Sequence, residues 1–133
     1  MLPTEATQPV PDTRPIDRGV SALGRVVYDH EIFGQQRYGG ISRYFCELAT
    51  RVANSPGWRA RVVAPVHFND HLAQCSAPRL GLYIRQRSVE SARLYRAVNK
   101  LIAPPLLRAC RADLVHRTYY AAHPQPPRGQ LAV

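Results

Sequence analysis

The first hydrophobic segment of the chain is short and continuous. Residues 23–29 read LGRVVYD, with β-branched residues in the middle and a polar exit at Asp29. Runs of this kind are typical of strands that are covered by helices on both faces of a parallel sheet. We therefore predict a buried parallel strand here, followed by a loop over residues 34–40.

The next segment has the period of a helix. Its apolar residues recur at i, i+3, i+4, i+7, i+8 and i+11, which predicts an amphipathic helix over residues 41–54. The expected buried face consists of Ile41, Tyr44, Phe45, Leu48, Ala49 and Val52. Ser55, Pro56 and Gly57 end the helix, and residues 58–65 (WRARVVAP) predict a second strand. Together these elements form a β-α-β unit, which is almost always right-handed and belongs to a parallel sheet.

The second half of the chain continues the alternation of strands and helices less clearly. We expect a short helix within residues 67–74 and a weak strand at residues 80–84. Residues 88–107 have near-helical spacing, but Pro104 and Pro105 should break or restart that helix. A second helical piece would then cover residues 106–112, and residues 112–120 (ADLVHRTYY) would start with a polar turn and become another strand.

The two ends of the chain differ from its middle. Residues 1–22 contain four prolines among polar residues, which predicts a disordered Pro-rich tail. Residues 131–133 follow a Pro-rich linker and look like the first residues of a further strand. We therefore expect one partial domain over residues 23–133. Its fold class is α/β, a Rossmann-like parallel sheet with flanking helices that forms an incomplete half of a larger protein.

The chain is strongly basic. Lys and Arg number 18 against 9 Asp and Glu, which gives a net charge of +9, and Lys100 is the single lysine. The arginines are scattered, which is compatible with a solvated basic surface. The alternative is an anionic partner, such as a sugar phosphate, a nucleotide or a membrane surface. We find no nucleic-acid-binding motif, so we expect no nucleic-acid partner.

Cysteine content and hydropathy indicate the compartment. Cys46, Cys75 and Cys110 lie far apart and form no CxxC pair, which argues against a disulfide framework and against a metal site. Cys46 and Cys110 fall in apolar-periodic segments and are expected to act as small buried hydrophobic residues. The sequence has neither a membrane span nor a signal peptide. We expect a cytoplasmic protein, and its charge is compatible with peripheral contact at the inner face of the membrane.

The pair Gly39-Gly40 lies between the first strand and the first helix. Two glycines permit positive φ angles and a close approach of the backbone to a ligand. At a helix start they leave the first N–H groups accessible, and the helix dipole favours an anion there. The pattern matches neither GxGxxG nor GxxxxGK[ST], so it does not indicate a common dinucleotide or P-loop site. A tight strand-to-helix turn without a ligand is the alternative.

Other candidate ligand-binding residues follow strands or begin the helix. Asp29 and His30 follow the first strand at the edge where such sheets bind ligands, and could contact sugar hydroxyls. Arg43 lies in the first helical turn, where it could hold an anion or face solvent. His116, Tyr119 and Tyr120 end a later strand, and the tyrosine rings could stack on a sugar or serve packing. No cofactor and no metal ligand set is expected, and catalytic residues are not assigned.

Two segments resemble the N-terminal region of glycosyltransferase family 4 proteins of the GT-B fold. The first is YDHEIFGQQRYGGISRYFCELATRV, beginning at Tyr28. It matches at Tyr28, Asp29, Ile32, Phe33, Gln36, Tyr38, Gly39, Gly40, Ile41, Ser42, Arg43, Tyr44, Phe45, Glu47, Leu48 and Ala49. The second is ADLVHRTYY, which matches at Asp113, His116, Thr118, Tyr119 and Tyr120. Arg117 stands where the family often has proline.

The resemblance implies a function that composition and spacing do not show. Proteins of this family have two Rossmann-like domains with a cleft between them, and the N-terminal domain mainly holds the acceptor. The resemblance therefore implies transfer of a sugar from a nucleotide-diphosphate sugar to a saccharide or lipid-linked acceptor, with Gly39 and Gly40 near the donor phosphates. The C-terminal donor-binding domain is missing from these 133 residues, so we expect the chain to be inactive alone. A non-catalytic anion-binding module and a truncated gene remnant are the alternatives.

Overall fold

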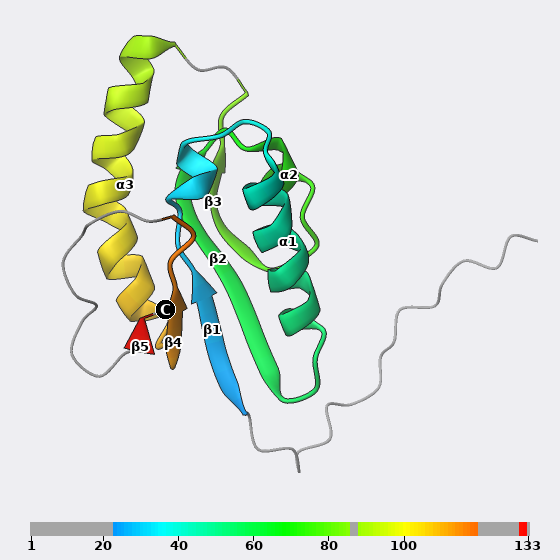
Figure 1. The fold of residues 1–133 in the computed structure, drawn as a ribbon. Helices are drawn as coiled ribbons and strands as arrows, with labels where there is room; N and C mark the ends of the chain where they lie inside the picture. Colours follow the sequence, from blue (N-terminus) through cyan, green and yellow to red (C-terminus); the bar gives the residue numbers. More distant parts are fainter. Residues whose placement is uncertain (1–22, 86–87, 120–130, 133) are drawn as a thin grey trace, which may run out of the picture.

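The computed structural model describes residues 23–85, 88–119 and 131–132 (Figure 1). The predicted disordered tail at residues 1–22, the Pro-rich linker and Tyr120 lie outside the described residues. The elements are β1 (Gly24–Tyr28), the 3-10 helix η1 (Ile32–Gly34), α1 (Gly40–Ala53), β2 (Trp58–His67), α2 (Asp70–Ala73), β3 (Arg79–Tyr83), α3 (Val89–Ala109), β4 (Leu114–His116) and β5 (Leu131–Ala132).

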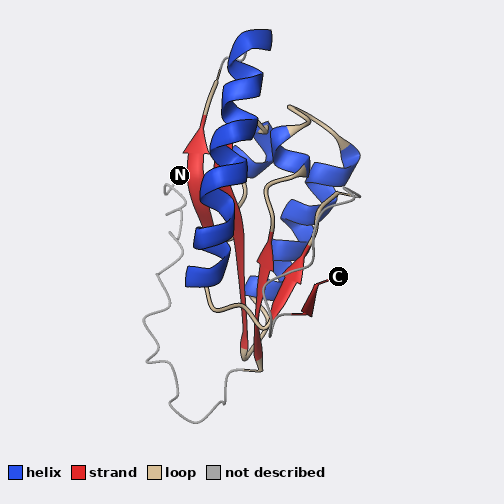
Figure 2. Ribbon diagram, turned by 90° about the vertical axis from the view of Figure 1, so that its left-hand side faces the viewer, coloured by secondary structure: helices blue, strands red, loops and turns tan. Residues whose placement is uncertain are grey.

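The described strands form a parallel five-stranded sheet in the order β3-β2-β1-β4-β5. Helices α1 and α2 cover one face of this sheet, and α3 covers the other (Figure 1). The predicted α/β Rossmann-like fold is confirmed. The amino-terminal turns of α3 extend beyond the carboxyl ends of the strands, as the two perpendicular views show (Figures 1 and 2).

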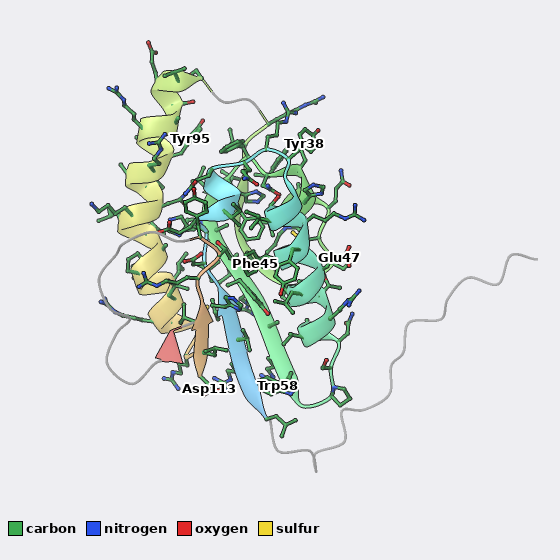
Figure 3. All side chains as sticks on the ribbon, in the orientation of Figure 1. Tyr38, Phe45, Glu47, Trp58, Tyr95 and Asp113 are labelled. Carbon is green, nitrogen blue, oxygen red and sulfur yellow. The ribbon has the colours of Figure 1, made fainter. Side chains whose placement is uncertain are left out.

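Alternate residues of the strands build two separate cores. Val26 and Tyr28 of β1 face α1, where they join the larger cluster with Phe33 and Phe45. Figure 3 shows Phe45 on the side of α1 that faces the sheet and Glu47 on the opposite side. Val27 points to the α3 face and belongs to a smaller cluster. That smaller cluster also contains Val63, Ala112 and Val115, with Leu80, Leu106, Leu107 and Cys110 packed against it.

Helix α1 buries a different stripe from the one that its apolar pattern predicts. Ile41 is 47% exposed and Tyr44 is 59% exposed, so the expectation that both are buried was wrong. The residues buried on α1 are Ser42, Phe45, Cys46 and Ala49. Ser42 is tolerated there because its hydroxyl donates a hydrogen bond to the carbonyl of Gly39 at 3.0 Å.

Helix α3 continues through both of its prolines, so the predicted break and second helical piece were wrong. Pro104 and Pro105 are exposed, which leaves the carbonyls that lose their N–H partners on the solvent side of the helix. Ser88 caps the amino terminus by accepting the N–H of Ser91 at 3.1 Å, and the two side chains complete a capping box. The helix contacts the sheet mainly through small or polar buried residues, which are Ala92, Asn99 and Ala103.

Strand β2 runs two residues beyond the expected end, and its register with β3 shifts between Val63 and Val66. Pro65, which has no N–H, lies within this irregularity. Asn99 of α3 supplies the missing pairing, because its amide donates to the carbonyl of Val66 and accepts from the N–H of Val66, both at 2.8 Å. In β3, Gly81 has a φ of 152°, and a Cβ there would lie 1.7 Å from the carbonyl oxygen of Ala64. Only glycine fits at this close approach of the strands.

Two of the remaining expectations concern the cysteines and the membrane. Cys46 is buried and Cys110 is half-buried against the smaller core, as expected for small hydrophobic residues, and the cysteines in the described part of the chain are free thiols. Among the described helices, none combines the length and the apolar character that crossing a membrane requires. The predicted polar turn is followed by strand β4, which has only three residues, because the chain turns away after His116.

Candidate functional site

The neighbouring strands β1 and β4 form the topological switch point of the sheet. From β1 the chain leaves toward α1 on one face, whereas β4 follows α3 on the other face. Tyr28 pairs with His116 in register, and the N–H of Asp29 donates to the carbonyl of His116 at 3.2 Å. Parallel α/β sheets bind their ligands outside the carboxyl ends of the strands at such a point. The structure thus brings Asp29, His30 and His116 to one edge, where the sequence pattern predicts them.

The carboxylate of Asp29 links the two loops that leave these strands. Its Oδ1 accepts hydrogen bonds from the Thr118 hydroxyl at 2.6 Å, the Thr118 N–H at 3.0 Å and the Glu31 N–H at 3.3 Å. The hydroxyl of Thr118 in turn accepts the N–H of Ile32 at 3.1 Å. Asp29 is 7% exposed and Thr118 is 3% exposed. Asp29 therefore positions the loops, and this contact accounts for its burial without a sugar hydroxyl.

A cluster of aromatic side chains lies on the α1 face of the sheet, close to the loops that follow β1 and β4. The His116 ring stacks on Tyr28, with centroids 5.4 Å apart and planes inclined by 28°. Phe45 of α1 meets the His116 ring edge-on at 5.2 Å. Tyr44, which is exposed, packs its ring against Phe45 at 5.3 Å. These contacts fix the orientation of the His116 imidazole at the edge of the sheet.

Both histidines of the site favour the neutral form. Burial lowers the pKa of His30 from its ordinary value, while the nearby charge of Asp29 acts in the opposite direction. Burial also lowers the pKa of His116, again opposed by Asp29. The Nδ1 atom of His30 is buried and has no hydrogen-bond partner among the residues that the structure describes. Neutral imidazoles can both donate to and accept from a hydroxyl group of a ligand.

The glycine pair forms the start of α1. Gly39 is the N-cap and gives no side-chain cap, and Gly40 is the first helical residue. Within the described chain, the N–H groups of Gly40, Ile41 and Ser42 have no hydrogen-bond acceptor, because the first bond of the helix is from the Arg43 N–H to the Gly39 carbonyl at 3.1 Å. Uncapped N–H groups at a helix start can bind an anion.

Backbone conformation does not require glycine at either of these two positions. Neither lies in the left-handed region, and the φ of Gly39 is 173°, which is extended backbone that any residue adopts. A Cβ on Gly39 would lie 2.0 Å from Oε1 of Gln36, whose amide occupies that space. A Cβ on Gly40 would have nothing within 4 Å, so this residue faces open space. The absent side chain of Gly40 leaves the first amides of α1 open to approach.

The remaining predicted residues that the structure describes lie at the surface. Arg43 is exposed in the first turn of α1, and Tyr119 is 40% exposed after β4. Tyr120 lies outside the described residues. Sequence reasoning noted Thr118 only as part of a family pattern and assigned no role to Gln36. The isolated threonine two residues after His116 is the one sequence signal that could have indicated the link to Asp29.

Metal ligands and relatives complete the description of the site. The residues that the structure describes contain no group of three or more His, Cys, Asp or Glu side chains that could hold a metal ion. Comparison of the chain with protein-family models, with curated proteins and with solved structures finds no match.

Proposed function

We propose that this chain is the acceptor-side, N-terminal part of a family 4 glycosyltransferase. Such an enzyme would transfer a sugar from a nucleotide-diphosphate sugar to a saccharide or lipid-linked acceptor. One observation carries the proposal. The two segments that resemble the family lie far apart in the sequence, yet the Asp29–Thr118 pair joins them across a separation of 89 residues. They meet at the carboxyl ends of β1 and β4, where an α/β sheet binds ligands.

Each part of the site has a role in this proposal. The free amides of the exposed residues Gly40 and Ile41 face the diphosphate of the donor, and the positive end of the helix dipole stabilises the charge on the leaving diphosphate. The neutral imidazoles of His30 and His116 hydrogen-bond hydroxyl groups of the acceptor. The exposed ring of Tyr119 supplies a stacking surface for a sugar.

Sugar transfer requires more than this chain provides. The attacking hydroxyl of the acceptor forms a bond to the anomeric carbon while the bond to the diphosphate breaks, and the diphosphate departs with its electron pair. The 133 residues contain no pair of glutamates with seven residues between them, which is the pattern that the resemblance implies for the donor-binding half. We therefore propose that a separate donor-binding domain completes the enzyme and that this chain alone has no transferase activity.

The proposal is tested by binding experiments on the chain itself. We expect UDP-glucose or GDP-mannose to shift the backbone amide resonances of residues 40–42 in a ¹⁵N-labelled sample. The Gly40→Ala variant should fold unchanged, because its Cβ has open space, and should bind the nucleotide sugar more weakly. Unshifted resonances for residues 40–42 with every nucleotide-diphosphate sugar tried would contradict the proposed donor contact.

A transfer assay addresses the need for a second domain. With a radiolabelled nucleotide sugar, we expect no product from the 133-residue chain. We expect turnover when the reading frame is extended to include a downstream Rossmann-like half with paired glutamates. Turnover by the chain alone would contradict the proposal that a separate donor-binding domain is required.

A further inference from the structure

A groove lies at the same edge of the sheet, on the α3 side. It is an open groove of about 1120 Å³ between the amino-terminal turns of α3 and the loops that follow β1, β2 and β3. Four arginines from three segments line it, which are Arg37, Arg85, Arg93 and Arg96. Phe68 and Tyr95 provide part of the apolar lining. The lining of the groove includes none of Gly39, Gly40, Asp29 and Thr118.

One side of the groove is held in place by an ion pair. The guanidinium of Arg37 donates from Nε to Oδ2 of Asp70 at 3.0 Å. The hydroxyl of Tyr83 donates to the other oxygen of the same carboxylate. Asp70 lies in α2, and Tyr83 is the last residue of β3, the outer strand of the sheet. These bonds therefore connect the loop before α1 to α2 and to the end of β3. Arg37 therefore has a fixed position and still exposes about half of its side chain.

The other three arginines lack an acidic partner within the described ranges, where no carboxylate lies within ion-pair distance of Arg85, Arg93 or Arg96. At the start of α3 the N–H of Ser91 is already bound by the Ser88 hydroxyl, so that amide is not available to an anion. The positive charges gathered in this groove repel one another, and a bound anion lowers the electrostatic energy of that repulsion.

We propose that this groove binds a ligand with two linked phosphate groups. Guanidinium groups bind phosphate oxygens in a bidentate manner, and four of them from three segments offer more donors than one phosphate group needs. The volume lies just above the range of about 300–1,000 Å³ that is typical of small-molecule sites, which leaves room beside the phosphates for an apolar part against Phe68 and Tyr95. The same diphosphate chemistry could come from a soluble metabolite or from a lipid carrier. The inference does not depend on glycosyl transfer.

Isothermal titration calorimetry with inorganic pyrophosphate tests the groove on the whole chain. We expect the double variant Arg93→Ala/Arg96→Ala to bind pyrophosphate about tenfold more weakly or worse, which corresponds to a loss of roughly 1.4 kcal/mol or more. Both side chains are exposed, so the far-UV circular dichroism and the urea midpoint should not change. The single charge reversal Arg96→Glu should weaken binding in the same direction.

A matched control removes the same charge elsewhere. Arg59 and Arg61 are exposed on β2 near the opposite, amino-terminal edge of the sheet, and Arg59→Ala/Arg61→Ala should leave pyrophosphate affinity within about twofold. Equal losses in the two double variants would mean that only net charge matters, and would overturn the proposal. An unchanged affinity in Arg93→Ala/Arg96→Ala together with a loss in Arg43→Ala would also overturn it, since the anion would then lie at the start of α1.

A second probe distinguishes a soluble diphosphate from one that is carried by a lipid. Farnesyl diphosphate in phosphatidylcholine vesicles carries the same group on a lipid. Tighter binding to these vesicles than to pyrophosphate, lost in Arg93→Ala/Arg96→Ala, supports the groove and assigns a lipid-borne ligand. Equal affinity for both probes, with the same loss, supports the groove and assigns a soluble ligand. The NMR experiment on the Gly40 amide tests the proposed donor contact by itself. Absence of nucleotide-sugar binding at α1 would therefore not be confused with absence of diphosphate binding in the groove.

Discussion

Replacing Thr118 by valine removes one hydroxyl and keeps the shape of the side chain. In the folded chain that hydroxyl donates to the Asp29 carboxylate at 2.6 Å and accepts the N–H of Ile32 at 3.1 Å. Asp29, Ile32 and Thr118 are all buried. The Thr118→Val variant therefore loses a hydrogen bond to a charged group, and it leaves the Ile32 N–H buried without an acceptor.

The size of the effect follows from these two losses. A hydrogen bond to a charged group contributes about 1.5–3 kcal/mol, and an unsatisfied buried donor costs about 1–3 kcal/mol. Asp29 keeps two N–H donors, from Thr118 and Glu31, so the terms do not add fully. We expect the free energy of unfolding to fall by about 2–5 kcal/mol, a large share of the roughly 5–15 kcal/mol typical of a domain.

Urea unfolding followed by far-UV circular dichroism measures this loss. The matched control is Thr50→Val, because the Thr50 hydroxyl donates at 2.8 Å to the Cys46 carbonyl within its own helix, and its one further contact is a weak one, with Sγ of Cys75 at 3.6 Å. It should cost less than about 1 kcal/mol. Thr118→Ser keeps the hydroxyl and should retain most of the stability. A loss in Thr118→Val no greater than that in Thr50→Val would refute the role of the Asp29–Thr118 pair.

Three further predictions follow from α3, from a buried imidazole and from the thiols. Pro104→Ala/Pro105→Ala should raise the free energy of unfolding by about 1–3 kcal/mol in urea titrations, because proline inside a helix is unfavourable; an unchanged midpoint would contradict this. Burial lowers the pKa of His67 to about 4, below the ordinary 6.5. The unfolded chain therefore gains a proton first, and stability should fall as pH drops from about 6.5 to 4; His67→Phe should lessen that slope, and an equal slope would count against it. Hydrogen bonding, first from the Cys46 thiol, lowers the pKa of Cys75 to about 6, so iodoacetamide at neutral pH should alkylate Cys75 before Cys46, as mass spectrometry of the digest would show.

The β-α-β core could be predicted from sequence because its signals are local. Residues 23–29 form a continuous apolar run, and residues 41–54 repeat with a helical period, so each element is specified by its own pattern. The prediction failed where the side of a helix that packs on the sheet decides the outcome, because that is not fixed by the apolar pattern alone. The buried stripe of α1 includes Ser42, which the Gly39 carbonyl satisfies, and helix α3 runs through its prolines because their side of the helix faces solvent.

The candidate site shows the same division between local and distant information. The positions of Asp29, His30 and His116 could be predicted, because residues after parallel strands collect at one edge of a sheet. The partner of Asp29 could not, because Thr118 lies 89 residues away and no periodicity connects them. The arginine groove was also missed. Its members are scattered in the sequence and become neighbours only when α3 packs on the sheet.

The amide of Asn99 gives α3 a fixed setting on the sheet. The small buried side chains of Ala92 and Ala103 offer little shape that would oppose sliding or rotation of the helix on the sheet. Two hydrogen bonds between Asn99 and Val66 oppose both movements, because either would leave the main chain of Val66 without its partner at the strand irregularity. Arg93 and Arg96 lie within two turns of Asn99 on the same helix. This uncharged carboxamide, together with Leu106 and Leu107 further along the helix, therefore helps to fix the distance between the walls of the groove.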